Sequence, residues 1–129
     1  MVWSMREEDK LIEKAENTLE DAKKAFDVDM MVSTVQNRIY YSIFYAAQAG
    51  LISRGIDAGS HQGVKIKIGE ELIKNDLLDK KWGRLFSQQQ TYREQADYQV
   101  DVDIEESDLK SYLDEAHSFI QEMKEIVSD

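Results

Sequence analysis

The chain has 129 residues and no cysteine, which excludes disulfides, thiolate metal sites and a cysteine nucleophile. This length supports one hydrophobic core rather than two. The net charge of −10 argues against a monomer that binds nucleic acid through a broad basic face.

Apolar residues recur at steps of three and four in five segments, and no segment shows the alternation typical of a strand. The sequence therefore predicts an all-α protein, an up-and-down bundle of five helices in a single domain over residues 1–129. We expect the helices at about residues 5–26, 30–54, 61–75, 80–98 and 107–127.

The second of these segments is apolar on nearly every face. Between Ile39 and Ala47 only Ser42 is polar, and four aromatic rings fall within six positions. A surface helix would be apolar on one side only. We therefore expect this helix to be surrounded by other helices or shared with a second subunit.

Short polar residues and glycines mark the helix ends. Asp29 is expected to cap the N-terminus of the second helix, and Ser60 that of the third. Gly55 is expected to end the second helix as its C′ glycine.

Charge is distributed unevenly along the chain. Residues 97–129 contain eleven acidic residues and two basic ones, whereas residues 60–93 contain seven basic residues and four acidic ones. The whole chain should repel polyanions, but the basic segment could still attract them.

The acidic stretch after the fourth helix does not form a calcium loop. Asp101, Asp103 and Glu105 alternate as such a loop requires, but Glu106 stands at the glycine position and Tyr112 at the position of the bidentate glutamate. A solvated acidic connection explains this stretch better.

A di-iron site is also excluded. The Asp114-x-x-His117 pair is half of such a motif, and His61 is the only other histidine. We therefore predict no metal ion and no other cofactor.

The fourth helix carries a polar stripe. Gln89–Gln90, Arg93 and Asp97 share one face, and Glu94 and Tyr98 share a neighbouring one. Two interpretations remain open: an exposed stripe with a weak Arg93–Asp97 pair, or a binding face.

Three motifs together resemble the HEPN domain, specifically its small stand-alone prokaryotic type. Residues 37–47 are similar to the family's second-helix signature, residues 60–63 to its entry into the third helix, and residues 92–98 to its fourth-helix motif. The resemblance covers nearly the whole chain.

The resemblance implies a homodimer in which the fourth-helix motifs meet near the subunit interface. Many members of the family are RNases, often toxins, and many pair with a small nucleotidyltransferase. Others bind nucleotides or act as partner modules. Arg93 matches the arginine of the RNase motif, and Glu94 stands at the polar position that follows it.

The histidine of that motif is missing, since Tyr98, Gln99 and Val100 occupy the three positions where it could stand. Metal-free RNA cleavage needs a group that exchanges a proton near neutral pH, as histidine does and tyrosine does not. Arg93 could still bind a phosphate. His61 could enter the site from another helix or subunit.

We therefore predict a homodimeric, cytoplasmic binding module that has no membrane segment and no efficient catalysis. It would bind a nucleotide or single-stranded RNA through its phosphate, beside a nucleotidyltransferase in a toxin–antitoxin-like pair. The expected ligand-binding residues are Arg38, Arg93, Glu94, Asp97 and Tyr98.

Two alternatives remain. The first is a metal-independent RNase whose catalytic residues are Arg93 and either Tyr98 or His61. The second is a structural dimeric scaffold, with the acidic segment 97–129 as its partner surface.

Overall fold

The computed structural model describes residues 5–98 and 104–128, and every regular element in these two ranges is helical. The elements are α1 (Glu7–Asp27), α2 (Val32–Ile52), α3 (His61–Lys67), the π-helical η1 (Ile68–Ile73), α4 (Lys80–Tyr98) and α5 (Glu106–Ser128). The predicted all-α bundle is confirmed. None of the described helices combines the length and apolar character needed to cross a bilayer.

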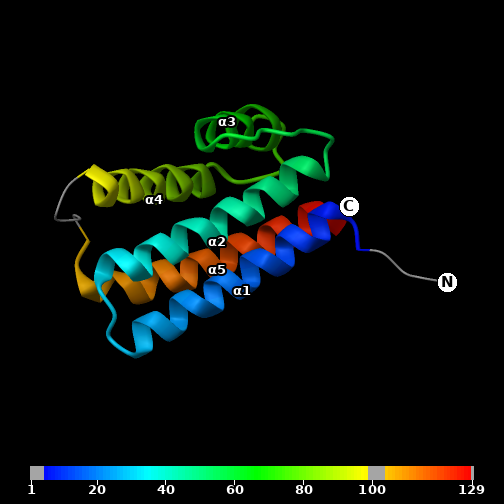
Figure 1. Cartoon of the computed structure of the whole chain (residues 1–129). Helices are drawn as coiled ribbons and strands as arrows, with labels where there is room; N and C mark the ends of the chain where they lie inside the picture. The colour runs from blue at the N-terminus through cyan, green and yellow to red at the C-terminus, as the bar shows by residue number, and fades with distance from the viewer. Residues whose placement is uncertain (1–4, 99–103, 129) are drawn as a thin grey trace.

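Helix α2 lies between two groups of helices (Figure 1). On one side α1 and α5 run alongside it and also pack against each other. On the other side α4 packs against α2, and α3 with η1 lies across from α4. This position explains why the α2 sequence is apolar on almost every face.

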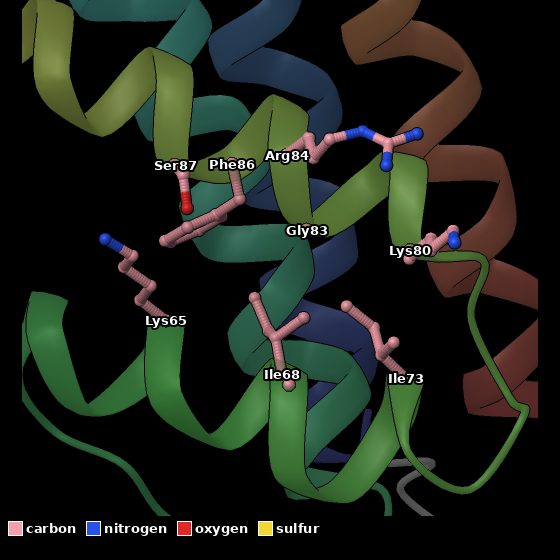
Figure 2. A pocket seen from close by; sticks show the side chains of 9 residues that line it. Lys65, Ile68, Ile73, Lys80, Gly83, Arg84, Phe86 and Ser87 are labelled. Carbon is pink, nitrogen blue, oxygen red and sulfur yellow. The ribbon is translucent and has the colours of Figure 1, made fainter.

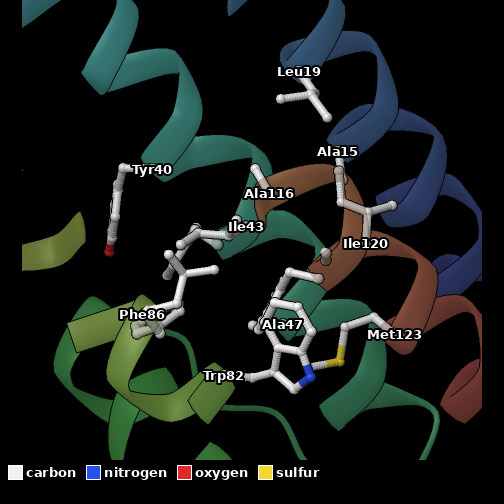
Figure 3. Packing of buried hydrophobic residues seen from close by; sticks show 14 of the residues in the cluster. Ala15, Leu19, Tyr40, Ile43, Ala47, Trp82, Phe86, Ala116, Ile120 and Met123 are labelled. Carbon is white, nitrogen blue, oxygen red and sulfur yellow. The ribbon is translucent and has the colours of Figure 1, made fainter. Parts of the chain in front are cut away.

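The core follows α2 from end to end (Figure 3). Small residues on α1, α2 and α5, such as Ala15, Ala47 and Ala116, have no exposed surface and let the three helices approach closely. Ile43 fills the space on the α4 side, and Ile120 of α5 is buried between α1 and α2.

Helices α1 and α2 both end in a Schellman motif, a six-residue hydrogen-bond pattern that closes a helix. At the end of α2 the Ile56 N–H donates to the Leu51 carbonyl over 3.0 Å, and Gly55 has φ +78°. The predicted C′ glycine is therefore confirmed. The predicted cap at Ser60 is confirmed too, because its Oγ accepts a hydrogen bond from the Gly63 N–H over 2.9 Å.

The prediction for Asp29 was wrong. Asp29 has φ 56° and closes α1, whose last turn is sealed by a hydrogen bond from the Met30 N–H to the Ala25 carbonyl. Aspartate tolerates this left-handed conformation better than most residues. Helix α2 then begins at Val32, after Met31, whose side chain gives it no cap.

The third predicted helix is continuous but changes its winding. It is α-helical to Lys67 and π-helical from Ile68 to Ile73, and the Lys74 N–H donates to the Gly69 carbonyl five residues earlier. π-helical turns are rare in proteins, but those that do occur often lie at functional sites.

Candidate functional site at the junction of α2, α3 and α4

Tyr40 is the centre of the site. It lies on the face of α2 that meets α3 and α4, and its side chain has no exposed surface. Its hydroxyl lies 2.7 Å from Nδ1 of His61, and which of the two atoms donates depends on the tautomer of the imidazole. Burial raises the pKa of Tyr40, so this hydroxyl stays protonated at neutral pH.

His61 is the first residue of α3, and its half-buried ring packs on the aromatic residues of α2. Its ring centroid lies 4.4 Å from that of Phe44. Burial lowers the pKa of His61, and the nearby positive charge of Arg93 lowers it further, against the opposing charges of Asp97 and Glu94. A neutral imidazole beside a guanidinium can accept a proton.

Arg93 approaches Tyr40 from α4. Its guanidinium carbon lies 5.3 Å from the centroid of the Tyr40 ring, within the range of a cation–π interaction. Its Nη1 donates to Oδ2 of Asp97 over 3.0 Å. The side chain is only 18% exposed, and its buried Nε has no hydrogen-bond partner among the described residues.

Arg38 approaches the same aromatic cluster from the other side. Its guanidinium donates twice to Oδ1 of Asn37 and lies 5.3 Å from the centroid of the Tyr41 ring. The Tyr41 ring in turn contacts both Tyr40 and His61 edge-on. Two guanidinium groups therefore flank one cluster of rings.

The polar stripe of α4 is buried in its first half and exposed at Glu94, Asp97 and Tyr98. Gln89 and Gln90 are buried, and Gln36 of α2 donates to the Gln89 carbonyl oxygen over 2.9 Å. In residues 5–98 and 104–128, every buried side-chain polar atom without a partner belongs to α4 or to Gln36, which faces it. These atoms lie in Gln36, Gln89, Gln90, Arg93 and Gln95. Such atoms call for an explanation, because most buried polar groups in proteins are paired.

The remaining predicted site residues lie at the edge of this cluster or outside it. Asp97 is paired with Arg93, and exposed Glu94 accepts a 3.4 Å hydrogen bond from Nε2 of Gln90. Tyr98, at the end of α4, is 87% exposed and takes no part in the buried cluster. The structure therefore brings His61 to Arg93 and leaves Tyr98 in solvent.

Tyr40 and Gln36 are the site residues that the sequence reasoning missed. They lie four residues apart on α2, so they share a face. A glutamine one turn before a tyrosine, on a helix with a largely apolar sequence after Arg38, was the available signal. The sequence did not show that this face meets α4.

In the part of the chain that the structure describes, no group of three or more histidine, aspartate or glutamate residues could hold a metal ion. Asp101 and Asp103 of the calcium-loop comparison lie outside the described residues. The groups that the site brings together are the guanidinium of Arg93 with the carboxylate of Asp97, the imidazole of His61 and the phenol of Tyr40.

Comparison with known proteins identifies the family. The sequence profile of the HEPN domain matches residues 9–126. The chain belongs to the HEPN domain family. The fold and the three motifs noted in the sequence agree with this assignment.

Three HEPN relatives illustrate what the chain resembles. A "UPF0332 protein" of Thermotoga maritima is 30% identical over 129 residues, which cover 97% of each chain. A Methanocaldococcus jannaschii protein named "Putative toxin MJ0142" is 34% identical over 92% of this chain and 80% of its own. A second protein of that organism, named "Putative toxin MJ0605", is 31% identical over 92% of this chain and 87% of its own.

Proposed function

We propose that this HEPN protein binds single-stranded RNA or a nucleotide through a phosphate held by Arg93. The observation that carries the proposal is the buried Nε of Arg93, a donor without a partner in the described residues, on a side chain that is 18% exposed. A phosphate oxygen could accept from the exposed terminal nitrogens of this guanidinium, and a shift of the side chain would bring Nε within its reach as well.

The surroundings of Arg93 support this proposal. The partly exposed rings of Tyr41 and His61 lie beside it and pack on the buried rings of Tyr40 and Phe44, and Arg38 lies over the Tyr41 ring. Aromatic and cationic groups side by side are typical of proteins that bind single strands.

We further propose that the protein acts in the cytoplasm as a homodimer, in a toxin-like system with a nucleotidyltransferase partner. Two of its relatives carry toxin in their names.

A second candidate function is metal-independent RNA cleavage, with His61 as the proton carrier. The 2.7 Å contact between Tyr40 and His61, beside Arg93, favours it. His61 would take the proton of a ribose 2′-hydroxyl, and Arg93 would stabilise the charge that develops on the phosphate. Tyr98, the other predicted catalytic residue, is 87% exposed and remains a weaker alternative.

Titration with the dinucleotide UpU at low ionic strength tests phosphate binding. We expect Arg93→Ala to weaken binding at least about tenfold, and Arg93→Lys to weaken it less because the charge remains. Lys24→Ala, an exposed cation on α1, is the control for the loss of one charge. Equal affinities for the wild type and Arg93→Ala would refute the proposal.

Asp97→Asn provides a test of opposite sign. Asp97 occupies one nitrogen of Arg93, so removal of its charge should strengthen UpU binding several-fold. Asp114→Asn, at an exposed position of α5, changes the net charge by the same amount as Asp97→Asn and should leave the affinity for UpU nearly unchanged.

An RNA cleavage assay in EDTA separates the two functions. Cleavage by the wild type that is lost in both Arg93→Ala and His61→Gln would establish the RNase. Binding of RNA without cleavage, even at high protein concentration, would support the binding function over the RNase. Absence of both activities would favour the structural scaffold.

A further inference from the structure

A groove of about 410 Å³ runs between α4 and the helix formed by α3 and η1 (Figure 2). Ile68, Ile73 and Phe86 form its apolar floor. Lys65 and the Ser87 hydroxyl lie at one end, and Lys80 and Arg84 lie at the other. This volume lies within the usual range for ligand sites.

The charges of this groove all have one sign. Lys65, Lys80 and Arg84 line it together with no acidic residue, and none of the three forms an ion pair with any described residue. Lys67, on the same helix as Lys65, is by contrast paired with Glu70 at 3.2 Å. Three unpaired cations on a chain of net charge −10 indicate a site for an anion.

Two glycines line the groove and affect its shape in different ways. An added Cβ at Gly83 would lie 2.6 Å from Cδ1 of Ile73, so this glycine allows α4 to approach η1. An added Cβ at Gly69 would meet no atom within 4 Å, although Gly69 lines the groove. The space beside Gly69 is therefore free for a ligand.

The groove leads towards the Arg93 site. The two helices run antiparallel across it, with Lys65 opposite Ser87 and Ile73 opposite Gly83. One turn before Lys65 on α3 stands His61. From Lys80 to Arg93 the distance along α4 is about 20 Å, at 1.5 Å for each residue.

We propose that this groove holds the continuation of a single-stranded polynucleotide whose phosphate is bound at Arg93. Lys80 and Arg84 would bind phosphates at the far end, Lys65 would bind one at the end nearer to Arg93, and the apolar floor would contact sugars and bases. The proposal rests on the proposed function, because it places the strand that flanks the phosphate at Arg93.

An acidic peptide is the competing occupant, since it could also present charge to the rim. Two observations favour the polynucleotide. The cations lie at both ends of the groove, so an extended phosphate backbone that crosses the apolar floor could contact all three. Along both helices, the Lys65–Ser87 end of the groove is also the end nearer to His61 and Arg93.

The test compares a labelled uridine octanucleotide with UpU, because only the longer strand reaches both sites. We expect Lys80→Gln/Arg84→Gln to weaken binding of the octanucleotide about tenfold and to reduce its salt dependence. Binding of UpU should change less than about twofold by the same variant, since it needs only Arg93. Lys10→Gln/Lys24→Gln, on the exposed side of α1, removes the same charge elsewhere.

Gly69→Met is an independent variant that blocks the groove without removing a charge. Its side chain has room to enter the groove, so folding should be preserved. Weaker binding of the octanucleotide with unchanged binding of UpU is expected. Gly59→Met, also without a neighbour within 4 Å but outside the groove, should change neither.

The outcomes separate this inference from the proposed function. If Arg93→Ala alone affects both ligands and the groove variants match their controls, the groove proposal fails and the phosphate site stands. If the groove variants weaken the octanucleotide while Arg93→Ala does not, the strand is bound without the proposed Arg93 site and its placement here is wrong. If the groove variants lose only a labelled octaglutamate peptide, the groove binds an acidic protein segment instead.

Discussion

The two sides of α2 are built differently. Towards α1 and α5 the buried side chains are aliphatic or small except for Phe119, and the buried hydroxyls of Thr18 and Ser42 bond to carbonyls of their own helices. Towards α3 and α4 the buried set includes Gln36, Gln89 and the phenol of Tyr40. On the α1–α5 side these buried hydroxyls have hydrogen-bond partners within their own helices. On the α3–α4 side several buried polar atoms have no partner among the described residues.

This difference separates stability from function within one small bundle. Burial of apolar side chains stabilises the fold and leaves no polar group that a ligand would have to pair. Unpaired buried polar groups cost free energy and persist where something else uses them. The side of α2 that is less favourable for folding is therefore the side on which to look for activity.

The largest effect on stability is expected on the α1–α5 side. Ile120 is 1% exposed, so Ile120→Ala should lower the free energy of unfolding by about 2–5 kcal/mol, measured by urea denaturation. Ile66→Ala, at a site that is 46% exposed, is the control and should cost far less. Similar losses in both variants would contradict the assignment of the core.

A smaller effect is expected where Gln36 meets Gln89. Gln36→Ala should cost about 1–3 kcal/mol, because it opens a cavity and leaves the Gln89 amide unpaired. The double variant Gln36→Leu/Gln89→Leu should recover most of this loss or exceed wild-type stability. A double variant that is less stable than either single one would show that these amides stabilise the fold.

Two glycines of the groove should respond differently to alanine. Gly69→Ala should raise the free energy of unfolding by about 0.5–1 kcal/mol, since a Cβ there meets nothing and alanine favours a helix. Gly83→Ala should be less stable than Gly69→Ala by about 1 kcal/mol, because its Cβ would displace Ile73. Thermal unfolding of the two variants measures this difference. Equal stability would mean that Ile73 of η1 can move away from the added Cβ at little cost.

The smallest effect concerns pH. The pKa of His61 is lowered from its ordinary value of 6.5, so the folded protein holds this proton less firmly than the unfolded chain does. Stability contributed by the neutral ring is present above that value and is lost as the pH falls below it. Between pH 7 and 5 the wild type should lose more stability than His61→Gln, and parallel losses would show that the imidazole is not desolvated.

The bundle could be predicted from the sequence because its signals are local. Helical spacing, the Gly55 end and the Ser60 cap are each decided within a few residues. The beginning of α2 was misplaced because Asp29 suits both an N-cap and a left-handed helix end, and only the path of the chain selects between them. The π turn at Ile68–Ile73 left no signal in the apolar spacing.

The candidate site could be predicted only in part. Arg93, Arg38 and Asp97 were found from their positions in motifs, and the Arg93–Asp97 pair from its four-residue spacing. The partnership of His61 with Tyr40 joins residues 21 positions apart, and periodicity within one helix cannot reveal such a contact. Tyr98 follows Arg93 by five residues, which directs it away from the Arg93 side of α4 and into solvent.

On the proposed function, the pairing of Arg93 with Asp97 would make ligand binding an exchange reaction. In the absence of a ligand, the Asp97 carboxylate holds the Arg93 guanidinium in place over the Tyr40 ring. The side chain would therefore lose little conformational entropy when a ligand binds. Each incoming anion must compete with that resident carboxylate, which lowers affinity and speeds release. A protein of this design would sample many strands briefly rather than hold one tightly.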